Sequence, residues 1–246
     1  MIAANQLTKR YGKHTILESI DLEIGDGERV AVLGSNGAGK TTLLKCMLGL
    51  VDFEGRLTID GLDVKSSGRA ARQRLAYVPQ MPPVFDLSLS AFLDLFGEIR
   101  SVDPASVASR LSDLGLALDA YGEKPMRQLS GGMLQKAYLA LALAADSAVL
   151  LLDEPTAGLD PGSRQEFIEH LADVNGDRCM VLATHRLEEA ESIAERLIIL
   201  HRGGIVFDGP LGESNGADAR GAIGGQALEQ VVKRFLTVAD ELVYDQ

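Results

Sequence analysis

The stretch Gly34-Ser35-Asn36-Gly37-Ala38-Gly39-Lys40-Thr41-Thr42 fits the pattern G-x-x-x-x-G-K-[ST] and lies between two recognisable elements. Residues 29–33 before it form the apolar run of a buried strand, and residues 41–50 after it read as a helix that is apolar on one side. Glycines allow backbone N–H groups to turn toward an anion, and the helix N-terminus adds its positive dipole. The stretch therefore predicts a phosphate-binding loop within an α/β fold.

Individual residues of this loop have separate expected roles. Lys40 is placed to reach the β- and γ-phosphates of a nucleotide, and the Thr41 hydroxyl is placed to bind Mg²⁺. The remaining residues are expected to surround the phosphates: Gly34, Ser35, Asn36, Gly37, Ala38, Gly39 and Thr42. An ordinary glycine turn between a strand and a helix is the competing interpretation, and it would leave the lysine and the threonine without a purpose.

The overall composition describes one large globular domain or two small ones. The 246 residues are 46% hydrophobic and 24% charged, and 24 basic against 35 acidic residues give a formal charge of −11. Such an acidic chain argues against sequence-independent binding of nucleic acid, which requires a basic surface. We therefore expect no nucleic-acid partner.

Features of export and of membrane insertion are weak in this sequence. Cys46 and Cys179 form neither a disulfide framework nor a zinc-binding spacing, so reduced cytosol is the natural compartment. The first six residues lack the charged and apolar regions of a signal peptide. The longest apolar tract, residues 137–152, is interrupted by Asp146 and is too short to span a bilayer. We expect a cytoplasmic chain that would need a partner to supply membrane spans.

Strand patterns occur in both halves of the chain and predict two kinds of sheet. Residues 16–24 alternate with period 2 and residues 55–61 form a short strand between turns, which suggests a small antiparallel β subdomain. Residues 148–152 and 179–183 are continuous apolar runs, typical of a parallel sheet covered on both faces. Residues 74–78 read as a further core strand, and helices beginning near Pro161 and Leu187 alternate with the later strands. The order favours a mainly parallel core sheet.

The middle and the end of the chain have other patterns. Residues 88–118 are helical, with a second helix after Pro104, so we expect a helical subdomain inserted at about residues 81–128. The domain that contains the phosphate loop would then cover residues 1–209. Residues 210–246 are expected to form a Gly-rich linker and an amphipathic helix. This helix could pack on the subunit's own core, dimerise or bind a partner.

Two acidic residues close the apolar strand at residues 148–152. In a chain with a phosphate loop, Asp153 can hold a Mg²⁺-bound water, and Glu154 can orient and deprotonate the water that attacks the γ-phosphate. Two solvated acids at a strand end are the simpler interpretation, but the upstream loop gives both residues a chemical role.

A second anion-binding loop lies between these two motifs. Ser130, Gly131 and Gly132 precede a helix, where hydroxyl and backbone N–H groups can donate to phosphate. One nucleotide does not need two such loops from the same molecule. The simplest explanation is a head-to-tail dimer, in which the first loop of one copy and the second loop of the other enclose each nucleotide.

The ordered set of motifs resembles the ATP-binding subunit of ABC transporters. After the phosphate loop come Tyr77-Val78-Pro79-Gln80, Leu129-Ser130-Gly131-Gly132, Leu150-Leu151-Leu152-Asp153-Glu154-Pro155-Thr156, Gly158-Leu159-Asp160 and Thr184-His185. The resemblance covers essentially residues 7–209. It implies a P-loop ABC-ATPase fold, an ATP hydrolase that uses ATP and Mg²⁺, and a dimer with ATP at the interface.

The resemblance also assigns roles to four more residues. Tyr11 resembles the aromatic residue that stacks on adenine, although it could also be an ordinary half-buried strand tyrosine. Gln80 resembles the glutamine that contacts Mg²⁺ and the attacking water and responds to the membrane partner. Asp160 resembles the aspartate that links the two sites of the dimer. His185 resembles the histidine that contacts the γ-phosphate.

Two residues of the second loop and its helix depart from the usual family pattern. Met133 replaces the glutamine that ordinarily ends the motif, and Lys136 replaces an arginine, keeping the charge but losing the planar guanidinium. We expect the second loop and catalysis to survive both changes.

The implied function is an ATPase subunit that drives separate transmembrane permease subunits from the cytoplasmic face of the membrane. A homodimer is expected because both loops look intact, and pairing with a paralogue is the alternative. The apolar residues Val84, Phe85 and Leu87 either receive a helix of the permease or pack the core of the helical insert. The competing function is a soluble ABC ATPase acting on ribosomes or DNA, which the single cassette and the acidic charge disfavour. A P-loop kinase or GTPase would leave the second loop and His185 unexplained.

Overall fold

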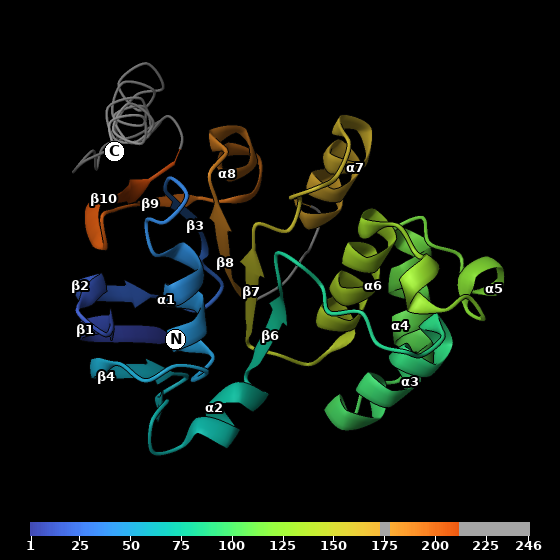
Figure 1. Ribbon diagram of the computed structural model, residues 1–246, viewed down its shortest axis with the longest axis horizontal. Coiled ribbons are helices and arrows are strands. Elements are labelled where there is room, and N and C mark those ends of the chain that lie inside the picture. The colour runs from blue at the N-terminus through green and yellow to red at the C-terminus, as the bar shows by residue number, and fades with distance from the viewer. Residues whose placement is uncertain (173–177, 212–246) are drawn as a thin grey trace.

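A four-stranded antiparallel sheet covers one side of the molecule (Figure 1). Its strands, in the order β2-β1-β4-β5, are His14–Ile24, Ile2–Tyr11, Glu54–Ile59 and Leu62–Asp63. The sheet confirms the expected antiparallel β subdomain. The alternation predicted for residues 16–24 is interrupted at Ser19, whose φ of 49° lies in the left-handed region. At this irregularity the pairing with β1 shifts register between Leu7 and Lys9. The structure, a computed structural model, describes residues 1–172 and 178–211.

A six-stranded sheet forms the centre of the molecule. Its order is β10-β9-β3-β8-β7-β6, and all neighbours are parallel except the edge strand β10, which is antiparallel to β9. The strands span Gly204–Pro210, Arg196–His201, Arg29–Leu33, Cys179–Thr184, Val149–Asp153 and Leu75–Val78. The mainly parallel core sheet is therefore confirmed. Because β3, β8 and β7 run in the same direction, the segments that follow them meet at one edge of the sheet.

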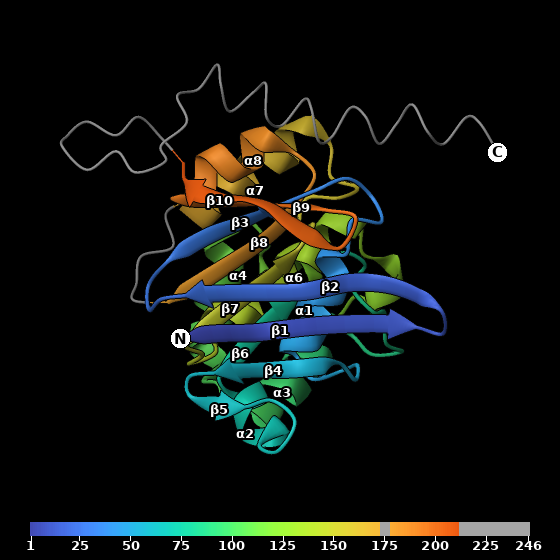
Figure 2. The same cartoon turned by 90° about the vertical axis from the view of Figure 1, so that its left-hand side faces the viewer.

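Helix α1 (Lys40–Met47) lies between the two sheets (Figures 1 and 2). It contacts β2 and β4 on one side and β7 and β8 on the other, and Leu43, Leu44 and Met47 are fully buried there. Helix α7 (Pro161–Ala172) contacts α8 (Leu187–Ile193), and α8 packs on β3 and β8. The packing of α1 between the sheets fixes the phosphate loop that precedes it.

A layer of helices covers β6 and β7 from the other side (Figure 1). It contains α3 (Leu89–Arg100), α4 (Pro104–Asp113), α5 (Leu118–Tyr121), the 3₁₀ turn η1 (Met126–Gln128) and α6 (Gly131–Ala144). Ser88 and Asp103 cap α3 and α4 by accepting hydrogen bonds from the backbone of their first turns. Of the helices in the expected insert, α3 and α4 pack on α6, α5 packs on α3 and α4, and α6 in turn contacts β6. Helix α2 (Gly68–Gln73) leads into β6.

No helix in residues 1–172 or 178–211 is long and apolar enough to cross a membrane. The linker and amphipathic helix expected at residues 210–246 lie, beyond Leu211, outside the described residues.

Candidate functional site

The loop between β3 and α1 requires glycine at two of its positions. Gly39 has a φ of 111°, and a Cβ there would lie 2.8 Å from Leu17 Cδ2 and 3.0 Å from the Ile16 carbonyl oxygen. A Cβ on Gly34 would lie 2.6 Å from the Leu200 carbonyl oxygen. These clashes keep larger residues out. The loop thus approaches β2 and β9 closely, and its last residue, Gly39, is the N-cap of α1.

A pocket of about 450 Å³ lies against this loop. Its wall combines the loop with residues from three other parts of the chain: Tyr11, Ile16, Asn36, Gly37, Gly39, Lys40, Thr41, Thr42, Gln80 and Glu154. All of them except Ile16 are residues that the sequence assigned to a nucleotide site. The fold therefore brings the end of β1, the phosphate loop, the segment after β6 and the end of β7 to one cavity.

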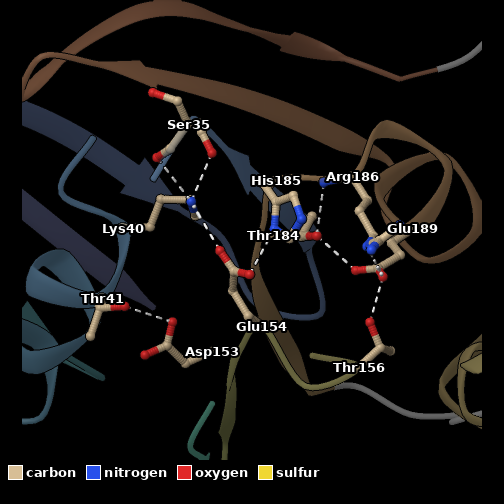
Figure 3. A network of polar contacts seen from close by, with 11 residues as sticks. Ser35, Lys40, Thr41, Asp153, Glu154, Thr156, Thr184, His185, Arg186 and Glu189 are labelled. Atoms are coloured by element: carbon tan, nitrogen blue, oxygen red, sulfur yellow. Dashed lines mark hydrogen bonds and ion pairs between the residues drawn. The ribbon is translucent and has the colours of Figure 1, made fainter. Parts of the chain in front are cut away.

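Glu154, which lines this pocket, contacts both Lys40 and His185 (Figure 3). Its Oε1 lies 3.1 Å from Lys40 Nζ, and its Oε2 lies 2.7 Å from His185 Nδ1. Because an ionised carboxylate only accepts hydrogen bonds, the proton of the second contact belongs to Nδ1. Lys40 Nζ also donates to the carbonyl oxygens of Gly34 and Ser35, at 2.7 and 3.2 Å. Lys40 and Glu154 are 5% and 6% exposed, so this ion pair is shielded from solvent.

The backbone of Glu154 has an unusual conformation. Its φ of 44° lies in the left-handed region, which costs a residue other than glycine about 1–3 kcal/mol. Its N–H donates to the Ala183 carbonyl oxygen at 2.8 Å, and its own carbonyl oxygen accepts from Ala157 N–H at 2.9 Å. Such strain persists where surrounding contacts over-determine the conformation, and the two backbone hydrogen bonds are contacts of this kind.

Asp153 lies beside the pocket and has the oxygen ligands that suit Mg²⁺. Its Oδ1 accepts from the Thr41 hydroxyl at 3.0 Å, and its Oδ2 accepts from the Tyr77 hydroxyl at 3.2 Å. Burial raises the pKa of Asp153 despite these two hydrogen bonds. Burial and the neighbouring Asp153 also raise the pKa of Tyr77. A carboxylate and a hydroxyl next to a phosphate loop are the hard oxygen donors that magnesium prefers, so these residues fit the ion.

Tyr11 and Gln80 stand at the open side of the pocket. The Tyr11 side chain is 46% exposed, and Lys9 Nζ lies 4.5 Å from its ring centroid. A ring with this exposure at a nucleotide pocket is available for stacking on a base, but a half-buried strand tyrosine would have the same exposure, so the stacking role stays a prediction. The side chain of Gln80 is also exposed.

The second loop and Asp160 lie apart from this pocket. Ser130 caps α6 by accepting from Met133 N–H at 3.2 Å, and Ser130 and Gly131 are exposed. Asp160 accepts from the Gly162 and Ser163 backbone and from the Ser163 hydroxyl, and these bonds, above all that hydroxyl, lower its pKa. Within one chain, Asp160 therefore stabilises the start of α7. In the described part of the chain, Ser130, Gly131 and Asp160 do not line the pocket of about 450 Å³.

Two residues of α6 contact the segment around Gln80, although no role was predicted for them from the sequence. Gln135, which is 1% exposed, donates from Nε2 to the carbonyl oxygens of Pro79 and Gln80, both at 3.2 Å. The Tyr138 hydroxyl donates to the Pro83 carbonyl oxygen at 2.8 Å. These contacts attach the segment around Gln80 to α6, the helix that begins with the second loop. A buried glutamine in an apolar helix was the available signal, because such a side chain needs partners.

A buried glutamate on α8 was also missed. Glu189 accepts hydrogen bonds from Thr156 and Thr184, which follow β7 and end β8 (Figure 3). In the sequence it is one of several acidic residues at the start of a helix, a pattern that favours a solvated face and gives no sign of burial.

Comparison with known proteins agrees with this arrangement. The family model for the ABC transporter matches residues 17–157. Nod factor export ATP-binding protein I of Cupriavidus metallidurans is 34% identical, over 85% of this chain and 71% of that protein. The daunorubicin resistance ATP-binding protein DrrA2 of Streptomyces coeruleorubidus is 36% identical, over 94% of this chain and 72% of that protein.

A solved structure supports the same assignment. The dimeric post-hydrolysis state of an ATP-binding cassette, bound to ADP and Pi, has a TM-score of 0.76 and 25% identity with this chain. The match covers 87% of this chain and 100% of that one. With the motif order and the pocket described above, these likenesses identify the fold as the P-loop ABC-ATPase fold. The chain is an ATP-binding, ATP-hydrolysing member of the ABC transporter family.

Proposed function

We propose that this chain hydrolyses Mg²⁺-ATP in a head-to-tail dimer and drives separate transmembrane permease subunits, to which it binds at the cytoplasmic face of the membrane. The single observation that carries the proposal is the separation of the two phosphate-binding loops. The pocket at Lys40 contains the first loop, whereas Ser130 and Gly131 are exposed elsewhere on the chain. A second copy can supply the missing loop.

The residues around the pocket divide the chemistry among them. The ring of Tyr11 holds the adenine, and the backbone of residues 34–39, with Lys40 and Thr42, holds the phosphates. Glu154 accepts the proton of the attacking water, and His185 and Gln80 orient the γ-phosphate and that water. A positioned general base contributes about 10²–10⁴-fold to the rate. Neighbouring Lys40 stabilises the charge that develops on the phosphate.

Thr41, Asp153 and Gln80 would hold Mg²⁺ in this site, with Asp153 binding through a water. The ion would supply positive charge to the β- and γ-phosphate oxygens. The hydrogen bond from Thr41 to Asp153 keeps both side chains on the same side of the loop.

The second loop completes the site from the partner subunit. Ser130 Oγ and the first N–H groups of α6 would donate to the γ-phosphate of the other copy, and Asp160 would lie between the two sites. Within one chain, the hydrogen bonds from Ser163 and Gly162 lower the pKa of Asp160 and so favour its negative form. One chain contains both loops, which favours a homodimer over pairing with a paralogue.

Light scattering on the purified Glu154→Gln chain tests the dimer. This variant should be monomeric alone and dimeric with Mg²⁺-ATP, because bound ATP is no longer consumed. The control is the Glu154→Gln/Gly131→Asp double variant. A Cβ on Gly131 has no neighbour within 4 Å, and an aspartate suits a helix N-terminus, but its charge would repel phosphate. The double variant should bind ATP and remain monomeric. A Glu154→Gln chain that binds ATP without dimerising would contradict the homodimer.

An apolar surface next to Gln80 supports the permease partner. Met81, Val84 and Phe85 are 83%, 50% and 38% exposed. The Phe85 ring lies 5.8 Å from that of Phe92 and 5.5 Å from that of Phe96. Phe92 and Phe96 also line a mainly apolar cleft of about 260 Å³ between β6 and the helices α3 and α6. Phe85 thus packs partly on the helical layer and partly faces solvent, where a helix of a permease could dock.

Replacing Phe85 with alanine should uncouple hydrolysis from the permease. We expect the Phe85→Ala subunit to retain a basal ATPase rate within about 2-fold of wild type, since Phe85 does not line the nucleotide pocket and its ring packs on Phe92 and Phe96. Stimulation by the reconstituted permease should be lost. The measurement is phosphate release with and without permease in proteoliposomes. Val206→Ala, at a 41% exposed apolar residue on β10, is the control and should keep full stimulation. Unchanged stimulation of Phe85→Ala would exclude this docking site.

A further inference from the structure

Glu189 is a buried glutamate in a position where two catalytic segments come together. Its side chain belongs to α8 and is 2% exposed. Oε1 accepts from the Thr156 hydroxyl at 2.5 Å, and Oε2 accepts from the Thr184 hydroxyl at 2.7 Å (Figure 3). Arg186 Nε lies 3.6 Å from Oε1. Both carboxylate oxygens are therefore occupied by groups from two different strand ends.

The two threonines are close neighbours of the proposed catalytic residues. Thr156 follows Glu154 by two residues, and Thr184 directly precedes His185. Thr184 Oγ1 also accepts from the Arg186 N–H at 3.1 Å. This hydrogen bond joins the residue before His185 to the residue after it. A displacement of either threonine would move Glu154 or His185 relative to the pocket.

The backbone hydrogen bonds between β7 and β8 end just before the residues that Glu189 contacts. The β7–β8 ladder extends to the pair Asp153 and Ala183, and the last backbone bond runs from Glu154 N–H to the Ala183 carbonyl oxygen. Within the described residues, no backbone hydrogen bond joins residues 155–157 to residues 184–186. The carboxylate of Glu189 bridges the two segments at this point.

Burying a carboxylate costs folding free energy unless the charge is paired and hydrogen-bonded. A glutamate at position 189 therefore needs the partners that surround it. The two hydroxyls and the nearby Arg186 satisfy the charge, and an apolar residue would fill the space without joining the two segments. In the bridge observed here both hydroxyls donate, so the group that joins them supplies two acceptors, as the two oxygens of a carboxylate do.

We propose that Glu189 is a positioning residue, which holds Thr156 and Thr184 together and thereby fixes Glu154 relative to His185. The 2.7 Å contact between Glu154 Oε2 and His185 Nδ1 is the geometry that this bridge maintains. The inference rests on the roles proposed above for Glu154 and His185. Misplacing a catalytic group by about 1 Å can cost about 10²-fold in rate.

Pairs of variants at Thr156 and Thr184 distinguish the effect of losing the hydroxyl from the effect of changing the packing. Thr156→Val and Thr184→Val keep the side-chain volume but lose the hydroxyl, and Thr156→Ser and Thr184→Ser lose a methyl group but keep the hydroxyl. We expect each valine variant to lower kcat about 10-fold or more. Each serine variant should stay within about 3-fold of wild type, and KM for ATP should change little in all four, because the pocket wall is intact.

Glu189→Ala tests the carboxylate itself, with Glu188→Ala as the matched control. Glu188 is the adjacent, exposed residue on the same helix, and its replacement should leave kcat unchanged. Removing Glu189 should lower kcat about 100-fold per ATP-binding site. Counting sites by equilibrium binding of labelled ATP excludes unfolded chains from the rate.

The outcomes distinguish this inference from the function it rests on. Valine and serine variants with the same kcat, at either threonine, would overturn the bridge, as would a Glu189→Ala chain with wild-type kcat. If Glu154→Gln hydrolyses ATP at the wild-type rate in the same assay, the proposed base fails instead. A loss of kcat in the valine variants alone, with unchanged ATP binding, supports positioning.

Discussion

The Glu154→Gln substitution is expected to lower kcat for ATP hydrolysis by about 10²–10⁴-fold, the range for loss of a positioned general base. The amide cannot accept the proton of the attacking water, but it keeps the shape of the carboxylate. Its oxygen can accept from Lys40 and its NH₂ can donate to His185 Nδ1 in the other tautomer. The nucleotide pocket should therefore remain, and the dissociation constant of Mg²⁺-ATP should change only a few-fold.

Phosphate release and equilibrium ATP binding, measured on the same preparation, check this result. Glu188→Gln is the control, because it makes the same chemical change at an exposed glutamate. A variant that loses ATP binding together with hydrolysis would show that Glu154 holds the pocket together. A variant that keeps hydrolysis within about 10-fold of wild type would exclude Glu154 as the base, since that loss is smaller than a general base contributes.

Much of this site could be predicted because its signals are local in the sequence. The phosphate loop, the acidic pair after β7 and His185 after β8 each follow an apolar strand directly. Parallel strands then bring such segments to the same edge of the sheet, whatever the details of packing. For the same reason, the two sheets and the helical layer followed from periodicity and from runs of apolar residues.

The contacts that support the site could not be predicted in this way. Gln135 reaches Pro79 across 56 positions of sequence, and Glu189 reaches Thr156 across 33. Which polar residue of a helix turns inward depends on how that helix packs, and this is a tertiary property. The left-handed conformation of Glu154 is similar, because propensity disfavours it and only the surrounding hydrogen bonds impose it.

Replacing Asp153 with asparagine should impair function while stabilising the metal-free protein. In the role proposed for Asp153, the loss of its charge weakens the hold on a Mg²⁺-bound water, because the amide oxygen accepts hydrogen bonds but carries no negative charge. We expect the Mg²⁺ concentration for half-maximal hydrolysis to rise at least about 10–100-fold, as for loss of residues that support metal ligands. A magnesium titration of ATPase activity measures this effect. The metal-dependent defect would be absent if Asp153 were merely a structural acceptor for Thr41 and Tyr77.

The stability of the metal-free chain should change in the opposite direction. Burial raises the pKa of Asp153 in the folded state, so its ionised form opposes folding. At pH values below the unfolded pKa, the carboxyl is protonated in both states and no penalty exists. As pH rises from that value through the raised folded pKa, the folded state loses stability relative to the unfolded chain.

Thermal unfolding in EDTA without nucleotide measures the difference between the two proteins. Asp153→Asn should unfold at a higher temperature than wild type at neutral pH, and the two should converge in acid, where Asp153 is uncharged. For a domain of this size, about 1 kcal/mol corresponds to about 2–4 °C. Equal melting temperatures at neutral pH would mean that Thr41 and Tyr77 compensate the buried charge fully. A higher melting temperature would show that the chain gives up stability for a charged group that only ATP and its metal ion require.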